Sequence, residues 1–354
     1  MKETRLLIKG NEAVGYGAIA AGCTCYFGYP ITPQNEIPEM LSQALPAAGG
    51  AFVQAESELA ASNMLLGAAA AGARAMTSSS SPGISLMQET LSYLAGSELP
   101  AVIVNMNRGG PGLGDIGSAQ GDYYQSTRGG GHGDYRTLVL APSTCQEAYD
   151  MMGEAFDLAF KYRNPVLVLG DGIVGTMKEP VTLKDMGAID NHGVEGWRAN
   201  GARGREKRLI KSLRLEEGAL AAHNTKLQAK YQAMRSEARA EEFMTDKAEL
   251  IVVAYGSIGR MAKSAIRKLR EQGHSVGLVR PVTLYPFPEE PLKALARKGA
   301  RFLTIEHNAG QMVDDVRLAL RTLADSDFHA LMPGNIPSAE DFVPPILAAL
   351  GRKQ

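Results

Sequence analysis

Thr32, Glu58 and Arg108 are the residues of this sequence whose types and positions could do chemistry together. Each follows a short apolar stretch that is typical of a buried strand. The carboxyl ends of parallel strands meet at one edge of a sheet, where open α/β sheets bind their ligands. We therefore expect a hydroxyl, a carboxylate and a guanidinium at one edge, which suits a small anionic substrate.

The carboxylate and the guanidinium each have a simpler interpretation. Glu56 and Glu58 lie two residues apart at the start of a predicted helix, so they point to nearly opposite sides and at most one faces a cleft. A single glutamate there could simply complement the helix dipole. Arg108 could bind a substrate carboxylate with two hydrogen bonds, or it could pair with Asp115 or Asp122. For a loop arginine, the ion pair is the more common arrangement.

A rigid corner at residues 28–33, Gly-Tyr-Pro-Ile-Thr-Pro, positions the hydroxyl. Pro30 and Pro33 push the residues before them towards extended geometry. Thr32 followed by Pro33 also matches a helix N-cap with a first-turn proline, and Glu36 would complement the dipole of the new helix. The sequence predicts a strand, a stiff turn and a helix that begins at Pro33. An ordinary, well-capped strand–turn–helix fits these residues equally well.

Three further motifs are weak signals of a cofactor or a base. Residues 15–20 match the dinucleotide pattern G-x-G-x-x-A, with Glu36 downstream, but both glycines fall inside an apparent helix instead of at its start. His132 could be a base or an ordinary loop histidine. Residues 170–172, Gly-Asp-Gly, suggest a diphosphate–Mg²⁺ site but no suitable Asn-Asn pair follows them. We interpret them as a strand-ending turn and expect no metal ligand in this chain.

The composition is that of a globular enzyme without a strong overall charge. The chain has 354 residues, 45% of them hydrophobic and 21% charged, with a formal net charge of −1. This balance does not favour nucleic acid or an anionic membrane as a partner. The sequence starts without an apolar leader and has no membrane-length apolar run. Cys23, Cys25 and Cys145 form neither a disulfide framework nor an iron–sulfur ligand set, so we expect a cytoplasmic protein.

Apolar strands alternate with helices in two blocks of the chain. This pattern predicts an α/β fold with parallel sheets covered on both faces. The first block, residues 1–180, has an ordinary domain size. Residues 181–247 include a stretch rich in Arg, Lys, Glu and Ala at helical spacing, so we expect a charged helical connector there. Residues 248–354 form the second, smaller block.

Six motifs, in order along nearly the whole chain, carry a family resemblance. They are Tyr-Pro-Ile-Thr-Pro at 29–33, Gln-Ala-Glu-Ser-Glu at 54–58, Gly-Pro-Gly at 110–112, Gly-Gly-Gly-His-Gly-Asp at 129–134, Arg-Pro-Val-Thr-Leu-Tyr-Pro at 280–286 and Glu-His-Asn-Ala-Gly-Gln-Met at 306–312. The sequence resembles the alpha-type, pyrimidine-binding subunit of the 2-oxoacid:ferredoxin oxidoreductases. It is most similar to the branch that acts on 2-ketoisovalerate (3-methyl-2-oxobutanoate).

The resemblance implies a fold and roles for individual residues. The first block would be a thiamine diphosphate fold of the pyrimidine-binding type, and the last would be similar to the transketolase C-terminal domain. By the family pattern Glu58 would be the catalytic carboxylate, which binds N1′ of the cofactor's aminopyrimidine and so promotes formation of the ylid. Thr32 and Arg108 would bind the carboxylate and carbonyl of the 2-oxoacid. Pro30 and Ile31 would contact the cofactor.

The implied reaction is the coenzyme A-dependent oxidative decarboxylation of a 2-oxoacid. It would yield acyl-CoA and CO2 through a thiamine diphosphate ylid, with ferredoxin as the electron acceptor, in anaerobic metabolism. The resemblance makes 2-ketoisovalerate the expected substrate. Pyruvate and 2-oxoglutarate stay open, because residue spacing says nothing about the far end of the pocket.

The resemblance also implies partners, because this chain lacks parts of the machinery. A beta subunit would hold Mg²⁺ and the cofactor's diphosphate. Further subunits, a gamma and an iron–sulfur delta subunit, would complete the path to ferredoxin. We expect a heteromeric complex, a dimer of such protomers, and no activity of the chain alone. The glycine-rich residues 109–133 are a candidate for part of the interface.

Two other classes of function stay open. Residues 15–20 would belong to a nicotinamide-dependent dehydrogenase, in which case NAD(H) should protect the chain against heat. Alternatively, the chain could be a non-catalytic assembly subunit. Substitution of Thr32, Glu58 and Arg108 would then leave activity unchanged.

Overall fold

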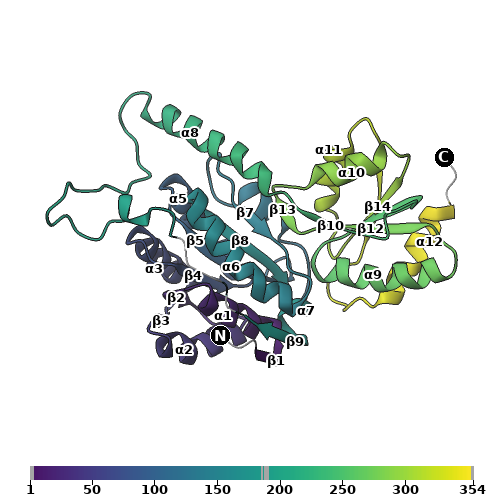
Figure 1. Cartoon of the computed structure of the whole chain (residues 1–354), viewed down its shortest axis with the longest axis horizontal. Helices are drawn as coiled ribbons and strands as arrows, with labels where there is room; N and C mark the ends of the chain where they lie inside the picture. The colour runs from purple at the N-terminus through teal and green to yellow at the C-terminus, as the bar shows by residue number, and fades with distance from the viewer. Residues whose placement is uncertain (1–3, 185, 187–190, 352–354) are drawn as a thin grey trace.

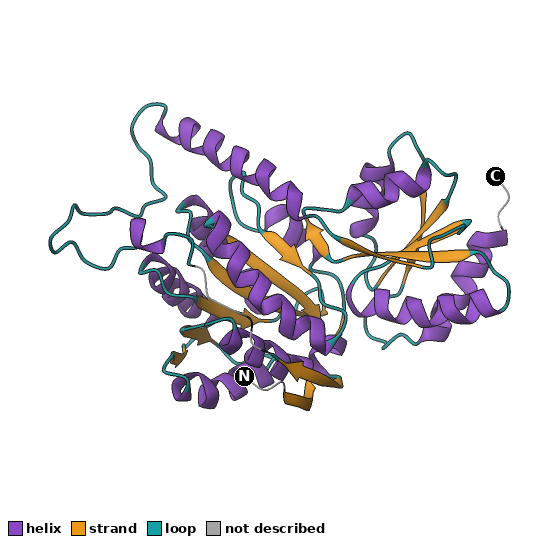
Figure 2. Ribbon diagram, viewed as in Figure 1, coloured by secondary structure: helices purple, strands orange, loops and turns teal. Residues whose placement is uncertain are grey.

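The computed structural model of the chain describes residues 4–184, 186 and 191–351, and the statements below concern these residues. Two α/β units lie side by side along the long axis of the molecule (Figure 1). Each unit has a sheet flanked by helices (Figure 2). The larger sheet belongs to the first unit.

The larger sheet has the strand order β13-β7-β8-β5-β4-β2-β3. Its strands pair in parallel, except that β13 runs antiparallel to β7. The strands are β2 (Cys25–Gly28), β3 (Ala51–Gln54), β4 (Ala75–Ser79), β5 (Ala101–Gly109), β7 (Leu138–Leu140), β8 (Pro165–Asp171) and β13 (Thr283–Tyr285). All of β4, β5 and β8 is buried, because their side chains meet helices on both faces of the sheet.

Among the described residues, seven helices of the first unit pack around the larger sheet, and side chains cap the start of some of them. They are α1 (Gly10–Ala20), α2 (Glu36–Ala47), α3 (Glu58–Ala70), α4 (Ser81–Leu86), α5 (Gln88–Gly96), α6 (Cys145–Tyr162) and α7 (Gly172–Thr176). The Ser57 hydroxyl accepts a hydrogen bond from Ala60 N at 3.1 Å and so caps α3. The Thr144 hydroxyl accepts one from Glu147 N at 3.0 Å and caps α6.

Shorter elements complete the first unit. Strand β6 (Asp115–Ser118) returns antiparallel to the end of β5 and forms a hairpin with it. A π-helical turn, η1 (Gln125–Gly129), follows. Strands β1 (Thr4–Lys9) and β9 (Lys178–Leu183) pair with each other in a separate antiparallel sheet.

The second unit has the strand order β10-β12-β11-β14-β15. Its strands are β10 (Ala240–Phe243), β11 (Leu250–Val253), β12 (Val276–Pro281), β14 (Arg301–Glu306) and β15 (Ser326–Ala330), and its helices are α9 (Gly256–Glu271), α10 (Glu289–Ala296), α11 (Met312–Leu320), the short η4 (Ala339–Phe342) and α12 (Val343–Gly351). Ile258, Ala262 and Ile266 recur at helical spacing along α9 and pack in the core below the sheet.

The segment between the units is only partly helical. The short η2 (Val194–Gly196), helix α8 (Ala219–Ala233) and η3 (Met234–Glu237) lie in it, and β10 then joins the second sheet. Residues 203–218 contain no helix, although charged residues at helical spacing predicted one. Gly204 and Gly218 adopt φ values of 75° and 74°, which interrupt a helix. Helix α8 is also tied to the first unit, since Lys226 pairs with Glu98 at 2.5 Å.

The predicted helix start at Pro33 is wrong. Helix α2 begins at Glu36 with Asn35 in the N-cap position, and Thr32 caps nothing. The carbonyl groups of the corner are bound by distant side chains instead. Asn11 Nδ2 donates to the Pro33 carbonyl at 2.7 Å, and Arg108 Nη1 donates to the Thr32 carbonyl at 3.0 Å. Because these long-range bonds occupy the two carbonyl groups, residues 33–35 stay non-helical and the helix begins only at Glu36.

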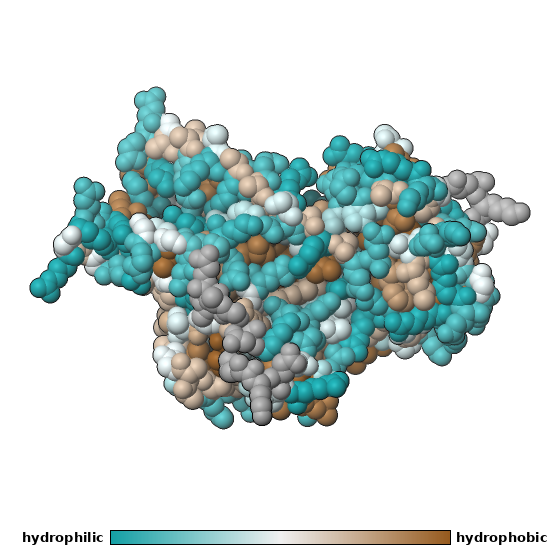
Figure 3. Space-filling view, viewed as in Figure 1, coloured by the Kyte–Doolittle hydropathy of each residue, from teal (hydrophilic) through white to brown (hydrophobic). Residues whose placement is uncertain are grey.

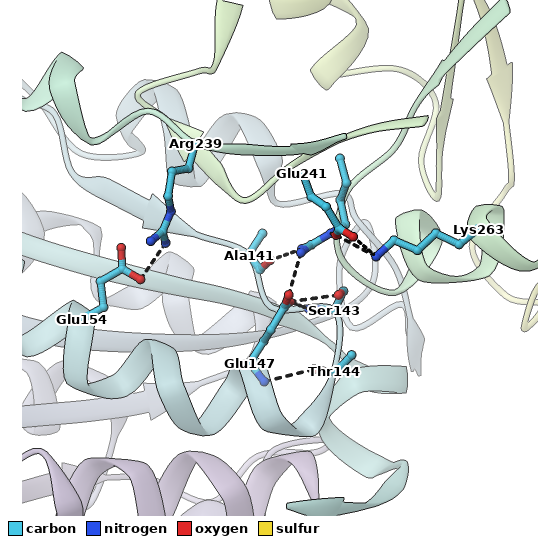
Figure 4. Close-up of polar contacts among 9 residues, drawn as sticks. Ala141, Ser143, Thr144, Glu147, Glu154, Arg239, Glu241 and Lys263 are labelled. Carbon is cyan, nitrogen blue, oxygen red and sulfur yellow. Dashed lines mark hydrogen bonds and ion pairs between the residues drawn. The ribbon is translucent and has the colours of Figure 1, made fainter. Parts of the chain in front are cut away.

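The two units meet through buried polar side chains as well as through β13. Arg280 of β12 is 2% exposed and binds Glu147 of α6 at 2.6 Å and Glu241 of β10 at 2.8 Å. Lys263 of α9 binds Glu241 as well, so the cluster draws on both units (Figure 4). Such contacts hold the units in one relative orientation, because an unpaired buried charge is costly.

The molecular surface is mainly hydrophilic on the face shown in Figure 3, with separate hydrophobic areas. Among the most exposed large apolar side chains are Leu113 at 82% and Ile116 at 62%, both in the β5–β6 hairpin. Within the described part of the chain, no helix is both long enough and apolar enough to cross a membrane.

Candidate active site

Thr32, Glu58 and Arg108 lie at the same edge of the larger sheet, as the strand ends predict. Arg108 reaches the corner after β2 by donating from Nη1 to the Thr32 carbonyl at 3.0 Å. Helix α4 connects the other two residues. Its Ser81 hydroxyl accepts from Arg108 N at 3.0 Å, and its Gly83 lies against the Glu58 carboxylate.

Glu58 is a buried carboxylate without a partner in the described chain. It is 7% exposed and occupies the first turn of α3, where Ser57 already supplies the cap. No hydrogen bond or ion pair to its carboxylate occurs among the described residues. A Cβ atom on Gly83 would lie 2.6 Å from Glu58 Oε1, so the missing side chain makes room for the carboxylate. Glu56 is exposed, which confirms that only one of the two glutamates faces inward.

Arg108 is a buried guanidinium held by backbone carbonyls. It is 8% exposed, and Nη2 donates to the Leu113 carbonyl at 3.2 Å while Nη1 binds Thr32. Its Nε atom is buried without a hydrogen-bond partner. A fixed guanidinium with a free donor is suited to bind a carboxylate from a ligand.

The alternative prediction for Arg108, an ion pair with Asp115 or Asp122, is wrong for the described chain. Asp122 instead accepts a hydrogen bond from Asn105 Nδ2 at 2.8 Å. Burial raises the pKa of Asp122 above its ordinary value, although hydrogen bonds from Ser81 and the neighbouring asparagines oppose the shift. Asp122 therefore belongs to a polar cluster with Ser81, Asn105 and Asn107 and is not the counterion of Arg108.

Ser81 fixes the backbone from which Arg108 projects. Its hydroxyl accepts from Asn107 Nδ2 at 2.7 Å and from Arg108 N at 3.0 Å. Because these bonds join α4 to the end of β5, the side chains of Glu58 and Arg108 share one rigid frame. The sequence showed only a serine-rich loop at residues 78–83. Its place after a strand at the same edge is the signal that could have marked Ser81 and Gly83.

Pro30 and Ile31 lie in the corner between β2 and α2. Pro30 is exposed and Ile31 is half-buried, so both offer apolar surface at this edge. The corner rests on Tyr26, whose hydroxyl is 2.8 Å from Ser78 Oγ. A Cβ atom on Gly28 would lie 2.3 Å from the Tyr26 hydroxyl, so this position requires glycine.

The group that the resemblance implies, an aminopyrimidine, fits the chemistry of this edge. Glu58 is 7% exposed, and the hydroxyls of Ser79 and Ser80 and the side-chain nitrogen Nε2 of Gln34 are buried without hydrogen-bond partners among the described residues. Buried polar atoms are normally satisfied, so a cluster of unsatisfied ones calls for a ligand or water. Unsatisfied acceptors and donors at one edge of the sheet suit a polar heteroaromatic ring.

The other sequence motifs have structural roles. Gly17 lies inside α1, where a Cβ atom would meet the Tyr149 carbonyl of α6 at 2.4 Å, so residues 15–20 serve helix packing and form no phosphate turn. His132 is exposed and lies edge-on to Tyr93. Asp171 ends β8 and caps α7, accepting from Ile173 N at 3.0 Å, which confirms the strand-ending turn.

Comparison with known proteins places the chain among the 2-oxoacid oxidoreductases. Residues 16–248 match the family model "Pyruvate flavodoxin/ferredoxin oxidoreductase, thiamine diP-bdg", and residues 248–342 match "Pyruvate:ferredoxin oxidoreductase core domain II". The chain is 49% identical to the ketoisovalerate oxidoreductase subunit VorB of Methanothermobacter thermautotrophicus over 98% of both chains. It is 41% identical to the 2-oxoglutarate synthase subunit KorA of Archaeoglobus fulgidus over 88% of this chain and 90% of that one.

Solved structures show the same fold. The chain matches 2-oxoglutarate:ferredoxin oxidoreductase from Magnetococcus marinus, solved with 2-oxoglutarate, coenzyme A and succinyl-CoA bound, with a TM-score of 0.88 and 26% identity. The match covers 98% of this chain and 65% of that one. A split-gene transketolase matches with a TM-score of 0.63 at 15% identity, over 98% of this chain and 99% of that one, and shares the fold alone.

The fold and the matches define a thiamine-diphosphate-binding α/β protein of the oxidoreductase class. The chain belongs to the pyruvate flavodoxin/ferredoxin oxidoreductase family, whose relatives above are subunits of heteromeric 2-oxoacid oxidoreductases. The predicted family, the predicted enzyme class and the predicted pair of α/β folds are confirmed.

Proposed function

We propose that the chain carries the pyrimidine-binding half of the active site in a 2-ketoisovalerate:ferredoxin oxidoreductase. The enzyme converts the 2-oxoacid and coenzyme A to acyl-CoA and CO2 and passes the electrons to ferredoxin. The observation that supports this proposal most directly is the buried carboxylate of Glu58, which lies beside Gly83 and has no partner among the described residues. The choice of acid is supported by the 49% identity to a ketoisovalerate oxidoreductase subunit over 98% of both chains.

The residues of the site have separate tasks in this proposal. Thiamine diphosphate, when bound, supplies the carbanion chemistry and the electron sink. Glu58 would hydrogen-bond the pyrimidine N1′ and hold a proton there, in a buried setting where such a bond is strong. Arg108 binds the substrate carboxylate with the donors that Thr32 and Leu113 leave free. The Thr32 hydroxyl contacts the substrate, and Pro30 and Ile31 contact the cofactor.

Partner subunits supply what this chain lacks in the proposal. A beta subunit holds Mg²⁺ and the diphosphate, and a gamma and a delta subunit, the latter with iron–sulfur clusters, complete the path to ferredoxin. Leu113 and Ile116, exposed by 82% and 62%, lie on the hairpin next to Arg108. Exposed apolar side chains beside the site are suited to burial against a partner. The complex contains two such protomers.

The substrate proposal is tested on the chain co-purified with its native partners. Viologen reduction is followed with 2-ketoisovalerate, pyruvate and 2-oxoglutarate, each with and without coenzyme A. We expect turnover that requires coenzyme A and a kcat/KM that is highest for 2-ketoisovalerate. A higher value for another acid would refute the substrate. No turnover with any acid, in a complex shown to contain thiamine diphosphate and iron, would favour the non-catalytic assembly subunit.

Arg108→Lys tests the substrate clamp. Lysine keeps the charge but loses the planar fork of donors, so the KM for the 2-oxoacid should rise roughly tenfold while the KM for coenzyme A stays unchanged. The control is Arg239→Lys, because Arg239 forms an exposed pair with Glu154, with side-chain exposures of 51% and 28%. An unchanged KM for the acid in Arg108→Lys would remove Arg108 from substrate binding.

A further inference from the structure

We infer that the second unit positions the substrate clamp through Gln120. In this view Gln120 is a positioning residue that ties the base of the β5–β6 hairpin to the loop after β14. The inference rests on the proposed role of Arg108 in binding the 2-oxoacid. It assigns the second unit a part in substrate binding, although the candidate site lies on the first.

Gln120 forms hydrogen bonds through both atoms of its side-chain amide and through its backbone N–H and carbonyl groups; we call this set of bonds the Gln120 clasp. It is 2% exposed, and its contacts come from two loops of the second unit. Gln120 N donates to the His307 carbonyl at 2.9 Å, and His307 N donates back to Gln120 Oε1 at 3.1 Å. Gln120 Nε2 donates to the Tyr255 carbonyl at 3.0 Å, and Asn308 Nδ2 donates to the Gln120 carbonyl at 2.8 Å.

The second-unit side of this clasp is itself fixed. Glu306 ends β14 fully buried, and its carboxylate accepts hydrogen bonds from Met312 N at 2.7 Å and Val313 N at 2.9 Å. Asn308 binds the same carboxylate at 3.0 Å. The loop that holds Gln120 is therefore anchored to the first turn of α11 within the second unit.

On the first unit, Gln120 is connected to Arg108 through the β5–β6 hairpin. Ser118, two residues before Gln120, pairs with Arg108 across the hairpin. The tip of the same hairpin supplies the Leu113 carbonyl that accepts from Arg108 Nη2 at 3.2 Å. One short hairpin therefore joins Gln120 to the guanidinium.

The hairpin depends on this base because it has little packing of its own. Residues 110–116 are all exposed, and Gly112 and Gly114 adopt φ values of 69° and 56°. A glycine-rich, solvated loop has low local stability, so its position is set where it is tied down. If the hydrogen bonds of Gln120 are removed, the Leu113 carbonyl should become more mobile, and the Arg108 guanidinium that it binds should be held less firmly in position.

Gln120→Met, made in the co-purified complex, tests the inference. Methionine keeps the volume but removes the side-chain bonds to His307 and Tyr255. We expect the KM for the 2-oxoacid to rise about fivefold with kcat within about twofold, because binding and not chemistry is affected. Amide hydrogen exchange in residues 109–118 should also quicken. Arg239→Ala is the control, since it breaks the ion pair of Arg239 with Glu154 of α6 without touching Gln120, and both readouts should stay unchanged.

The outcomes separate this inference from the proposed function. Unchanged KM and unchanged exchange in Gln120→Met, while Arg108→Lys raises the KM, would overturn the clasp alone. A fall in kcat and thermal stability without a change in KM would show that Gln120 only supports the fold, and would overturn it too. If Arg108→Lys leaves the KM unchanged, the substrate role of Arg108 fails, and the inference fails with it whatever the exchange shows.

Discussion

Gly83 decides, at the scale of single residues, whether Glu58 can occupy its place. A Cβ atom there would lie 2.0 Å from Ser79 Oγ and 2.6 Å from Glu58 Oε1. The Ser79 hydroxyl and the Glu58 carboxylate would both have to move to make room for it. The absence of one methyl group is thus a condition for the site.

Gly83→Ala should therefore impair turnover more than stability. The added methyl group would push the Glu58 carboxylate from its position, and displacements of this kind cost roughly a hundredfold in rate. The measurement is turnover of the complex alongside its melting temperature. Gly67→Ala, in the same helix as Glu58, is the control because nothing lies within 4 Å of its added Cβ. Equal turnover in the two variants would contradict the account.

The sequence predicted the placement of the chemical residues but not their support. Thr32, Glu58 and Arg108 could be found because each lies at or just after the end of a strand, and strand ends of a parallel sheet share an edge. Ser81 and Gly83 also follow a strand, but their roles could not be predicted, because they depend on which side chains approach α4 from other strands. Spacing along the chain carries no information about such contacts.

Helix α1 illustrates, at the scale of elements, how a sequence motif can have a packing role. Its glycines allow α1 to approach neighbouring helices closely. A Cβ atom on Gly17 would lie 2.4 Å from the Tyr149 carbonyl, and one on Gly15 would lie 2.6 Å from Met40 Sδ. The glycines at residues 15 and 17 are thus explained without a dinucleotide.

Gly17→Ala should destabilise the chain by about 1–3 kcal/mol, because the methyl group has to push α1 away from α6. Gly67→Ala, at an open helix position, should instead stabilise it by up to about 1 kcal/mol. Urea unfolding of the full-length chain compares the two midpoints. A Gly17→Ala midpoint at or above that of the wild type would contradict the packing role.

Elements were predicted well where the pattern is local and poorly where partners are distant. Strand β3, residues 51–54, follows Gly49 and Gly50 and includes apolar residues, a local pattern that indicates a strand. The start of α2 was misplaced, since Asn11 and Arg108 bind the carbonyls of the corner from elsewhere in the chain. Strand β13 could not be foreseen either, because it leaves its own unit to join the first sheet.

At the scale of the whole molecule, Arg280 links the two units and makes their association depend on pH. Burial alone would raise the pKa of Glu241, but the hydrogen bonds from Lys263 and Arg280 outweigh it and hold the pKa below its ordinary value of 4.5. A lowered pKa in the folded state means that this stabilisation is full above about pH 4.5 and is lost as the pH falls below it.

Arg280→Met should lower the stability of the chain by about 2 kcal/mol at pH 7, because it leaves two half-buried carboxylates without their shared partner. The difference from wild type should shrink as the pH falls from about 4.5 through the lowered pKa of Glu241, where this carboxylate becomes protonated. Thermal unfolding at both pH values measures it. Arg239→Ala, at an exposed pair, should change stability by less than about 1 kcal/mol. A difference that grows on acidification would contradict the role of the cluster.

Glu58→Gln tests the central claim most directly, namely that the unpartnered carboxylate of Glu58 serves the bound cofactor. The measurement is turnover and thiamine diphosphate content of the assembled complex, with the exposed neighbour Glu56→Gln as its matched control. We predict that Glu58→Gln assembles normally but loses roughly a hundredfold or more in turnover, because the acid–base contact to the pyrimidine ring is removed. Near-normal turnover of Glu58→Gln, in a complex that retains thiamine diphosphate, would show that Glu58 does not have this role.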